Sequence, residues 1–183
     1  MIRRSFLAFA CGALTLSACG FKLQGQQNYA FKRLAIVGAA PPVAARLTRM
    51  VEGGSDTVVV SSPANADAIL TVSEGRGQLT LTLNSLGIAE EYQLNYSLNY
   101  TLIGADGTVL LPGSVIALDR AMTYSDKYTL AKAQEADLLY ADMQNDAVNQ
   151  LTRRLAAVRS LHPTPSQQIP AIVPRAPLPP PPL

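Results

Sequence analysis

The sequence has little of what catalysis by side chains requires. It contains one histidine, two cysteines and no tryptophan among 183 residues, and only 15% of its residues are charged. Histidine is the commonest general base, and the single histidine, His162, stands beside Pro163 in a proline-rich stretch. No cluster of His, Cys and carboxylates has metal-site spacing, and no glycine-rich loop has the phosphate-binding pattern. The sequence therefore predicts a protein that is not an enzyme and that uses no cofactor or metal.

The first 18 residues differ from the rest of the chain. Two arginines precede the apolar run FLAFACGALTL, which is too short to span a membrane and is followed by small residues. The letters LSA directly before Cys19 resemble the lipobox of bacterial lipoproteins, in which the cysteine is acylated after cleavage. We therefore predict a signal peptide over residues 1–18 and lipid attachment at Cys19. An ordinary secretory signal with an incidental cysteine is the alternative.

Cleavage before Cys19 changes the charge of the chain. Two arginines leave with the signal, so Lys plus Arg falls from 15 to 13 and equals the 13 Asp plus Glu. Cys11 leaves as well, which excludes an intramolecular disulfide. Without a basic patch interleaved with aromatics, the chain lacks the signature of nucleic-acid binding. Gly20 follows the cysteine where an aspartate would resemble an inner-membrane retention signal, so we expect the outer membrane.

Strict alternation of apolar and polar residues predicts long strands. In YQLNYSLNYTL, from Tyr92 to Leu102, Tyr and Leu alternate with neutral polar residues, which indicates a strand with one apolar and one polar face. QLTLTLN alternates in the same way, and NSLGIAE joins the two segments as a hairpin. The chain turns again at Asp106 and Gly107 and returns through residues 115–122. We expect a three-stranded antiparallel meander that packs by its leucine and tyrosine side.

The other segments predict two helices and further strands. Apolar runs at 33–37 and 56–61 flank a helical pattern over 42–54, and residues 64–73 predict another strand. A long helix is expected from about residue 130 to 158, with a stripe formed by Ala136, Tyr140, Met143, Ala147, Leu151, Leu155 and Val158. The fold class predicted is α+β, with two helices packed on one face of a mostly antiparallel, four-stranded mixed sheet. The polar face of that sheet is left to water or to a partner, and the residues alone do not decide between them.

The end of the chain is rich in proline. Residues 160–183 read SLHPTPSQQIPAIVPRAPLPPPPL, and proline fixes φ and removes backbone donors. We therefore expect a disordered tail over 160–183 and one folded domain over 19–159.

Three stretches in this order resemble the LptE family of lipopolysaccharide-assembly outer-membrane lipoproteins. They are CGFKLQG at 19–25, AEEYQLNYSLNYTLIGADGTVLLPG at 89–113 and YTLAKAQEADLLYADMQNDAVNQLTRRL at 128–155. The resemblance implies two helices on a four-stranded sheet, anchored by lipid to the outer membrane and facing the periplasm. It also implies a one-to-one complex with the LptD β-barrel, whose lumen the domain would plug, and a part in lipopolysaccharide transport to the outer leaflet.

The resemblance also implies one ligand contact. Members of the family are thought to bind lipopolysaccharide, whose phosphates call for Lys or Arg. Lys132 in the letters LAK matches a family lysine and is the candidate, with a surface ion pair to Glu135 as the alternative. Asn84 and Ser85 stand where a second basic residue would complete a two-point contact, so that contact is not expected.

A different class of function stays open beside this one. A lipoprotein that faces the periplasm and binds or carries lipid without a barrel partner would share the anchor and the scarcity of catalytic groups. An unrecognised hydrolase is the third alternative, and the position of the single histidine argues against it.

Overall fold

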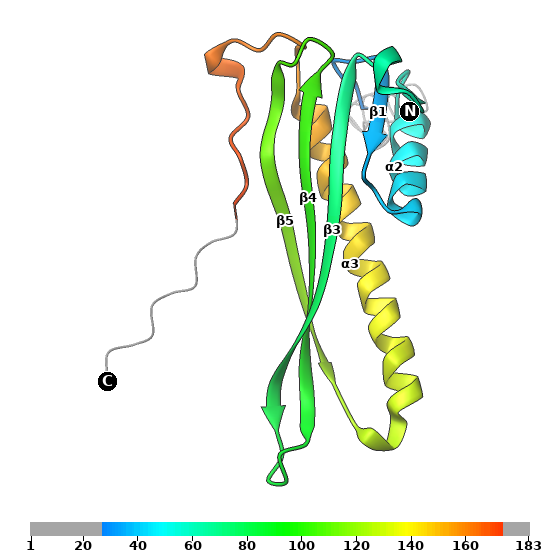
Figure 1. Ribbon diagram of the computed structural model, residues 1–183, viewed down its shortest axis with the longest axis vertical. Helices are drawn as coiled ribbons and strands as arrows, with labels where there is room; N and C mark the ends of the chain where they lie inside the picture. Colours follow the sequence, from blue (N-terminus) through cyan, green and yellow to red (C-terminus); the bar gives the residue numbers. More distant parts are fainter. Residues whose placement is uncertain (1–26, 174–183) are drawn as a thin grey trace, which may run out of the picture.

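The computed structural model describes residues 27–173 as one sheet with two helices on one face (Figure 1). The signal peptide and Cys19 lie outside these residues. The sheet order is β2-β1-β3-β4-β5. The elements are β1 (Arg33–Val37), α2 (Pro41–Gly54), β2 (Val58–Val60), η1 (Pro63–Asn65), β3 (Ala68–Leu83), β4 (Ala89–Gly104), β5 (Val109–Thr123), η2 (Asp126–Tyr128), α3 (Thr129–Ala157) and η3 (Pro165–Gln167).

The sheet is mixed, as predicted, but it has five strands where four were expected. β1 pairs in parallel with both β2 and β3, and β3, β4 and β5 form an antiparallel meander. The segments predicted separately at 64–73 and 78–84 are parts of one strand, β3. Gly75 and Gly77 interrupt the apolar alternation in the sequence, yet both residues stay paired with β4. Because glycine has no side chain, these two residues break the alternating pattern in the sequence, but they do not end the strand.

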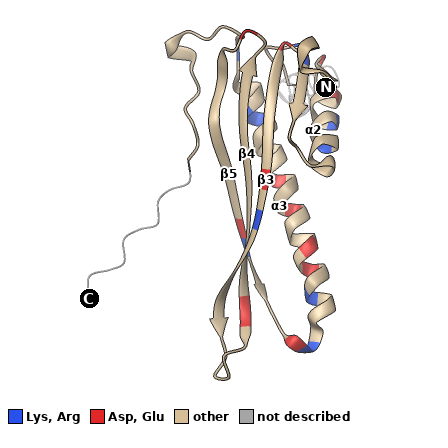
Figure 2. Ribbon diagram, in the orientation of Figure 1, with Lys and Arg blue, Asp and Glu red and all other residues tan. Residues whose placement is uncertain are grey.

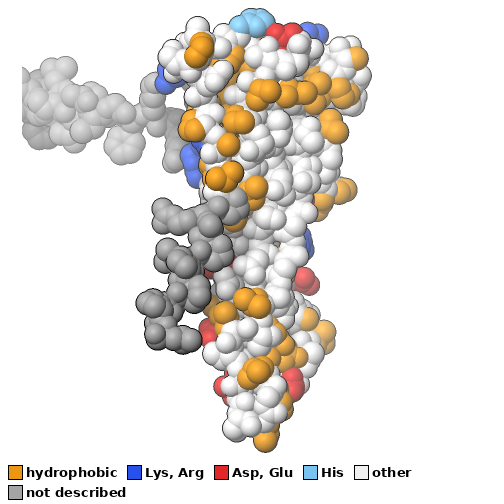
Figure 3. Space-filling model, turned by 60° about the vertical axis from the view of Figure 1, so that its left-hand side comes forward, with side chains coloured by type: hydrophobic (Ala, Val, Ile, Leu, Met, Phe, Trp, Pro, Cys, Tyr) orange, Lys and Arg blue, Asp and Glu red, His pale blue; other side chains and the backbone are white. Residues whose placement is uncertain are grey.

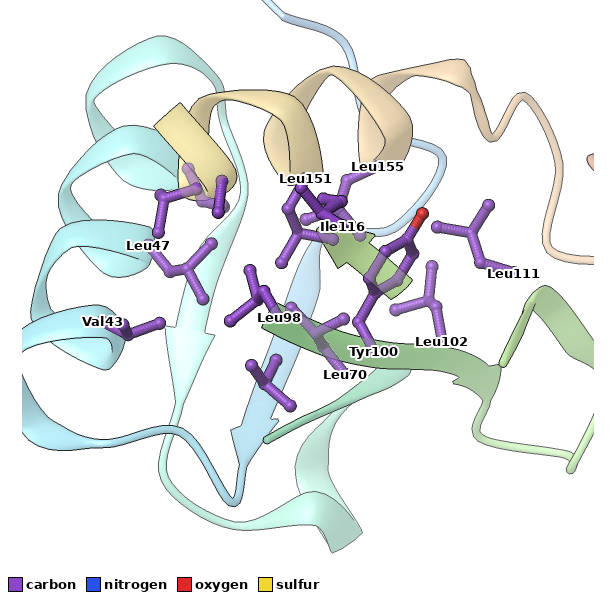
Figure 4. Close-up of a cluster of buried hydrophobic side chains, with 14 of the residues drawn as sticks. Val43, Leu47, Leu70, Leu98, Tyr100, Leu102, Leu111, Ile116, Leu151 and Leu155 are labelled. Atoms are coloured by element: carbon purple, nitrogen blue, oxygen red, sulfur yellow. The ribbon is translucent and has the colours of Figure 1, made fainter. Parts of the chain in front are cut away.

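The core lies between the two helices and the inner face of the sheet (Figure 4). Leu98, Tyr100 and Leu102 of β4 point from the sheet toward the helices, which confirms the predicted apolar face of this strand. Val43 and Leu47 come from α2, whose start at Pro41 fits the preference of proline for the first helical turn. Burial of these side chains supplies the main driving force for folding.

The long helix buries its stripe unevenly. Met143, Ala147, Leu151 and Leu155 are fully buried, whereas Ala136 and Tyr140 are only partly buried against the core. The helix therefore packs tightly over its second half and more loosely over its first half.

Residues 160–173 differ from the expected disordered tail. The Val115 N–H donates to the carbonyl oxygen of Ile172 over 2.8 Å, and the Ile172 N–H donates to Ser114 Oγ over 3.1 Å. Leu161 and Ile169 pack against the core. Proline removes backbone donors but leaves carbonyl groups and apolar side chains, and these attach the segment to the exposed edge of β5.

Candidate functional site

The outer face of the sheet carries the neutral polar side chains of β4. Thr71 and Ser73 of β3 face the same side, because they pair with Thr101 and Asn99 of β4. The outward residues of β4 in this region are Gln93, Asn95, Ser97, Asn99 and Thr101. Such side chains can hydrogen-bond a partner without the desolvation cost that buried charge would carry.

Small residues create a hollow of about 330 Å³ in the middle of this face. Gly75, Ser97 and Ala117 pair across the three strands, and the neighbouring row contains Gly77 and Asn95. A Cβ atom at Gly75 would lie 2.6 Å from Ser97 Oγ, so the hollow depends on the glycine. A second hollow of about 210 Å³ lies beside it along the same strands.

Leu79 lies on the outer face, and Leu81 and Leu83, beyond breaks in the register, are exposed, which corrects the expectation that these leucines share the packed side with the tyrosines. Leu79 pairs with the outward Gln93, whereas Thr80 pairs with the inward Tyr92. Leu79, Leu81 and Leu83 are 57%, 44% and 60% exposed, and Leu86 in the turn is 80% exposed. Alternation shows which residues share a face, but the interstrand register decides which face that is.

A polar cluster lies between the sheet and the middle of α3. Glu74 Oε2 accepts hydrogen bonds from Tyr96 Oη and Gln144 Nε2, both over 2.8 Å, while Glu74 Oε1 is buried with no partner among the described residues. Burial, aided by the Glu74 carboxylate, raises the pKa of the Tyr96 phenol. Tyr140 Oη donates to the Gly77 carbonyl oxygen over 2.6 Å. The sequence did not reveal this cluster, because Glu74 gives no signal of burial in an otherwise exposed segment.

Lys132 lies near the start of α3 with its ammonium group occupied. Its Nζ donates to Glu135 Oε2 over 2.8 Å and to Thr123 Oγ1 at the end of β5 over 3.1 Å. Only 18% of the side chain is exposed, against 47% for Glu135. The ion pair considered as the alternative for Lys132 is therefore present, and the lysine also joins α3 to β5.

The single histidine lies on the surface beside a carboxylate. His162 Nδ1 lies 3.4 Å from Asp106 Oδ2, and the histidine side chain is 78% exposed. Thr108 donates to Asp106 through its N–H and its hydroxyl, and these hydrogen bonds lower the pKa of Asp106. Within residues 27–173 no group of three His, Cys, Asp or Glu side chains is placed to hold a metal ion. In the same part of the chain no helix is long and apolar enough to cross a membrane.

Comparison with known families identifies the class of protein. The model of the LptE lipopolysaccharide-assembly family matches residues 21–155. The LPS-assembly lipoprotein LptE of Photorhabdus laumondii is 25% identical over 158 residues, which cover 84% of this chain and 86% of that protein. The LPS-assembly lipoprotein LptE of Yersinia enterocolitica is 26% identical over 166 residues, covering 84% and 76% of the two chains.

Solved structures show the same fold. Lipoprotein B from Nitrosomonas europaea, uncharacterised in function, is 33% identical, with a TM-score of 0.63 over 75% of this chain and 91% of that one. A minor lipoprotein from Acinetobacter baumannii, at 16% identity and a TM-score of 0.57, matches 72% of this chain and 96% of its own and shares the fold.

Proposed function

The chain belongs to the LptE family of lipopolysaccharide-assembly lipoproteins, and from this premise we propose that it plugs an LptD barrel and assists its assembly. In that complex it takes part in lipopolysaccharide transport to the outer leaflet. The observation that carries the proposal is the family match over residues 21–155. The neutral polar face of the sheet supports it, since a plug in a water-filled barrel must contact the wall without burying unpaired charge.

The proposed anchor is Cys19, acylated after removal of residues 1–18. Acyl chains attach a protein stably when more than one is present, because each buried methylene contributes about 0.8 kcal/mol. The folded unit proposed begins after the signal peptide, includes the attached residues 160–173 and is held at the periplasmic side of the outer membrane.

Co-purification tests the barrel partnership. The tagged mature chain is expected to recover an outer-membrane barrel in one-to-one ratio under mild detergent. Ser97→Arg places a charge in the hollow of the outer face and is expected to reduce recovery, whereas Ala133→Arg adds the same charge on the exposed side of α3 and serves as control. Absence of any barrel, together with transfer of lipid between vesicles by the monomer, would instead favour the lipid carrier.

We also propose that Lys132 contacts a phosphate of lipopolysaccharide. For this contact the ammonium group exchanges Glu135 and Thr123 for phosphate oxygens. Lys132→Gln is then expected to weaken lipopolysaccharide binding about tenfold, and Glu135→Gln to strengthen it by releasing the lysine. A lysine that only braces the helix predicts unchanged binding in both variants and a similar small loss of stability, which would contradict the contact.

A further inference from the structure

Three arginines gather on the helix side of the molecule around the first described residues. Arg49 on α2 and Arg153 on α3 line a hollow of about 500 Å³ between the helices. Arg153 and Arg159 line a second hollow of about 580 Å³. Gln27 lines both hollows, so they form one continuous surface, here called the arginine groove. Tyr29 Oη donates to Gln27 Oε1 over 2.7 Å and holds that residue in place.

The arginines of the groove have no protein acceptor within residues 27–173. Arg49, Arg153 and Arg159 are exposed and make no hydrogen bond or ion pair in this part of the chain. Arg33 and Arg120, in contrast, pair with carboxylates at 2.6 and 3.0 Å. Guanidinium groups without partners at a groove suit ligands that carry phosphate, which they bind in bidentate fashion.

The charged residues of α3 are unevenly distributed, with Lys132 near its start. Its carboxylates, Glu135, Asp137, Asp142 and Asp146, all precede the two arginines near its end, Arg153 and Arg154. Figure 2 shows red segments over the lower and middle parts of this helix with a blue segment near its lower end, and blue segments on α2 and near the upper end of α3. A helix C-terminus favours cations, which accounts for arginines in the last turns of α3. It does not account for Arg49 in the middle of α2 or for Arg159 beyond the helix.

The arginine groove lies close to the proposed lipid anchor. Gln27 follows Cys19 by eight residues, and an extended chain spans at most about 3.5 Å per residue. The groove therefore lies within about 28 Å of the acylated cysteine. This step depends on the proposed function, because it requires Cys19 to be the anchor.

We propose that the arginine groove binds the anionic headgroups of phospholipids in the membrane leaflet that holds the anchor. Basic side chains next to an anionic membrane gain affinity from the negative surface potential, which falls off within a Debye length. The lipid anchor keeps the groove within reach of that surface. The groove thus orients the domain on the membrane beyond the attachment that the acyl chains provide.

Flotation with lipid vesicles tests the groove separately from the anchor. The full mature chain carrying Cys19→Ser is mixed with phosphatidylcholine vesicles, with or without phosphatidylglycerol. We expect binding only to the vesicles that contain phosphatidylglycerol, and a loss of about tenfold or more when Arg49→Gln and Arg153→Gln are combined. Arg76→Gln with Lys127→Gln removes the same charge from exposed positions away from the groove and is expected to change binding little. Circular dichroism of each variant verifies the fold.

Each outcome bears on one proposal. The proposal that the groove binds anionic headgroups would be overturned by equal binding to both kinds of vesicle. It would also be overturned if the control variant lost as much binding as the arginine variant. Release by inorganic phosphate matched to the lipid phosphate would show a general phosphate site and overturn the membrane assignment. The acylated chain, in contrast, is expected to float with neutral vesicles whether or not the arginines are intact. If the acylated chain does not float with neutral vesicles, the proposed lipid anchor is contradicted. The dependence of vesicle binding on the arginines would still be judged from the Cys19→Ser chain.

Discussion

The two halves of the molecule differ in how their apolar side chains are used. In the broad half, where α2 and the second half of α3 cover the sheet, leucines such as Leu98 and Leu151 are fully buried. In the narrow half, around the β3–β4 turn and the start of α3, Leu83, Leu86 and Leu130 are 60%, 80% and 76% exposed. Figure 3 shows apolar side chains on the surface at the narrow lower end as well as over the broad upper part. Stability therefore resides in one half, and the other half presents surface for contacts.

The largest effect is expected from removing apolar volume in the broad half. Leu151→Ala should lower the free energy of unfolding by about 2–5 kcal/mol, because it leaves a cavity beneath α3. Leu86→Ala, in the exposed turn, should change it by less than about 0.5 kcal/mol. Urea denaturation of both variants measures the contrast, and similar losses would show that the narrow half is packed as tightly as the broad half.

Two glycines with positive φ sharpen the comparison. Gly38 (φ 79°) lies in the broad half, where an added Cβ would stand 2.6 Å from the Val72 carbonyl oxygen, whereas Gly87 (φ 78°) has open space around it. Gly87→Ala should cost about 1 kcal/mol from the left-handed conformation alone. Gly38→Ala should cost at least about 2 kcal/mol, because steric overlap adds to the same conformational cost. Equal losses in thermal or urea unfolding would exclude a contribution from the overlap.

The polar cluster between the halves should contribute less. Tyr96→Phe removes one of the donors to Glu74 and should lower the free energy of unfolding by about 1.5 kcal/mol, since the carboxylate is partly buried. Tyr128→Phe, at a 55% exposed ring, provides the control and should have little effect. If the two variants unfold at the same urea concentration, the hydrogen bond to Glu74 makes no net contribution to stability.

The smallest effect is expected from pH at the junction of β1 and β3. The side-chain hydrogen bonds from Arg33, with backbone donors of Lys32 and Arg33, hold the pKa of Asp67 below its usual value. A lowered pKa stabilises the fold above the unfolded value of about 3.9, and the contribution is lost as pH falls through the folded pKa. The stability difference between wild type and Asp67→Asn should therefore be constant near neutral pH and shrink below about pH 4.

The matched control for this pH experiment is Asp137→Asn. Asp137 is exposed on α3 and has no ion-pair partner within the described residues. The free energy of unfolding of Asp137→Asn should stay close to that of wild type across the pH range measured. A difference for Asp67→Asn that grows on acidification would contradict the assignment of the lowered pKa.

Local patterns predicted most of the regular structure. The stripe from Met143 to Leu155 and the alternation from Tyr92 to Leu102 correctly identified the buried faces of α3 and β4, because period alone decides which side chains share a face. The turn at Asp106 and Gly107 was also predicted correctly. The sequence patterns did not predict features that depend on contacts between segments far apart in the chain. The face of Leu79 depends on its pairing with Gln93, and the attachment of Ile172 depends on the free edge of β5.

The candidate sites also differ in whether the sequence alone could suggest them. Cys19 could be proposed from its neighbours in sequence, since a signal peptide is recognised by its local order of residue types. Lys132 could be named from a resemblance, but its contact with Thr123 required the packing of α3 beside the end of β5. The arginine groove gave no signal in the sequence, because Arg49 and Arg153 are 104 positions apart and meet only where α2 packs on α3.

The sequence by itself thus determined most of the helices and strands, the apolar faces of α3 and β4, and the family, because these depend on spacing between near neighbours. Only the tertiary structure decided which leucines stay exposed, which carboxylate is buried and which cations lack a partner within residues 27–173. The physical reason is that burial and pairing belong to contacts between distant segments. The spacing of apolar residues can be read from neighbouring positions in the sequence. Strand register and helix packing, in contrast, are set by the sum of many contacts between distant segments.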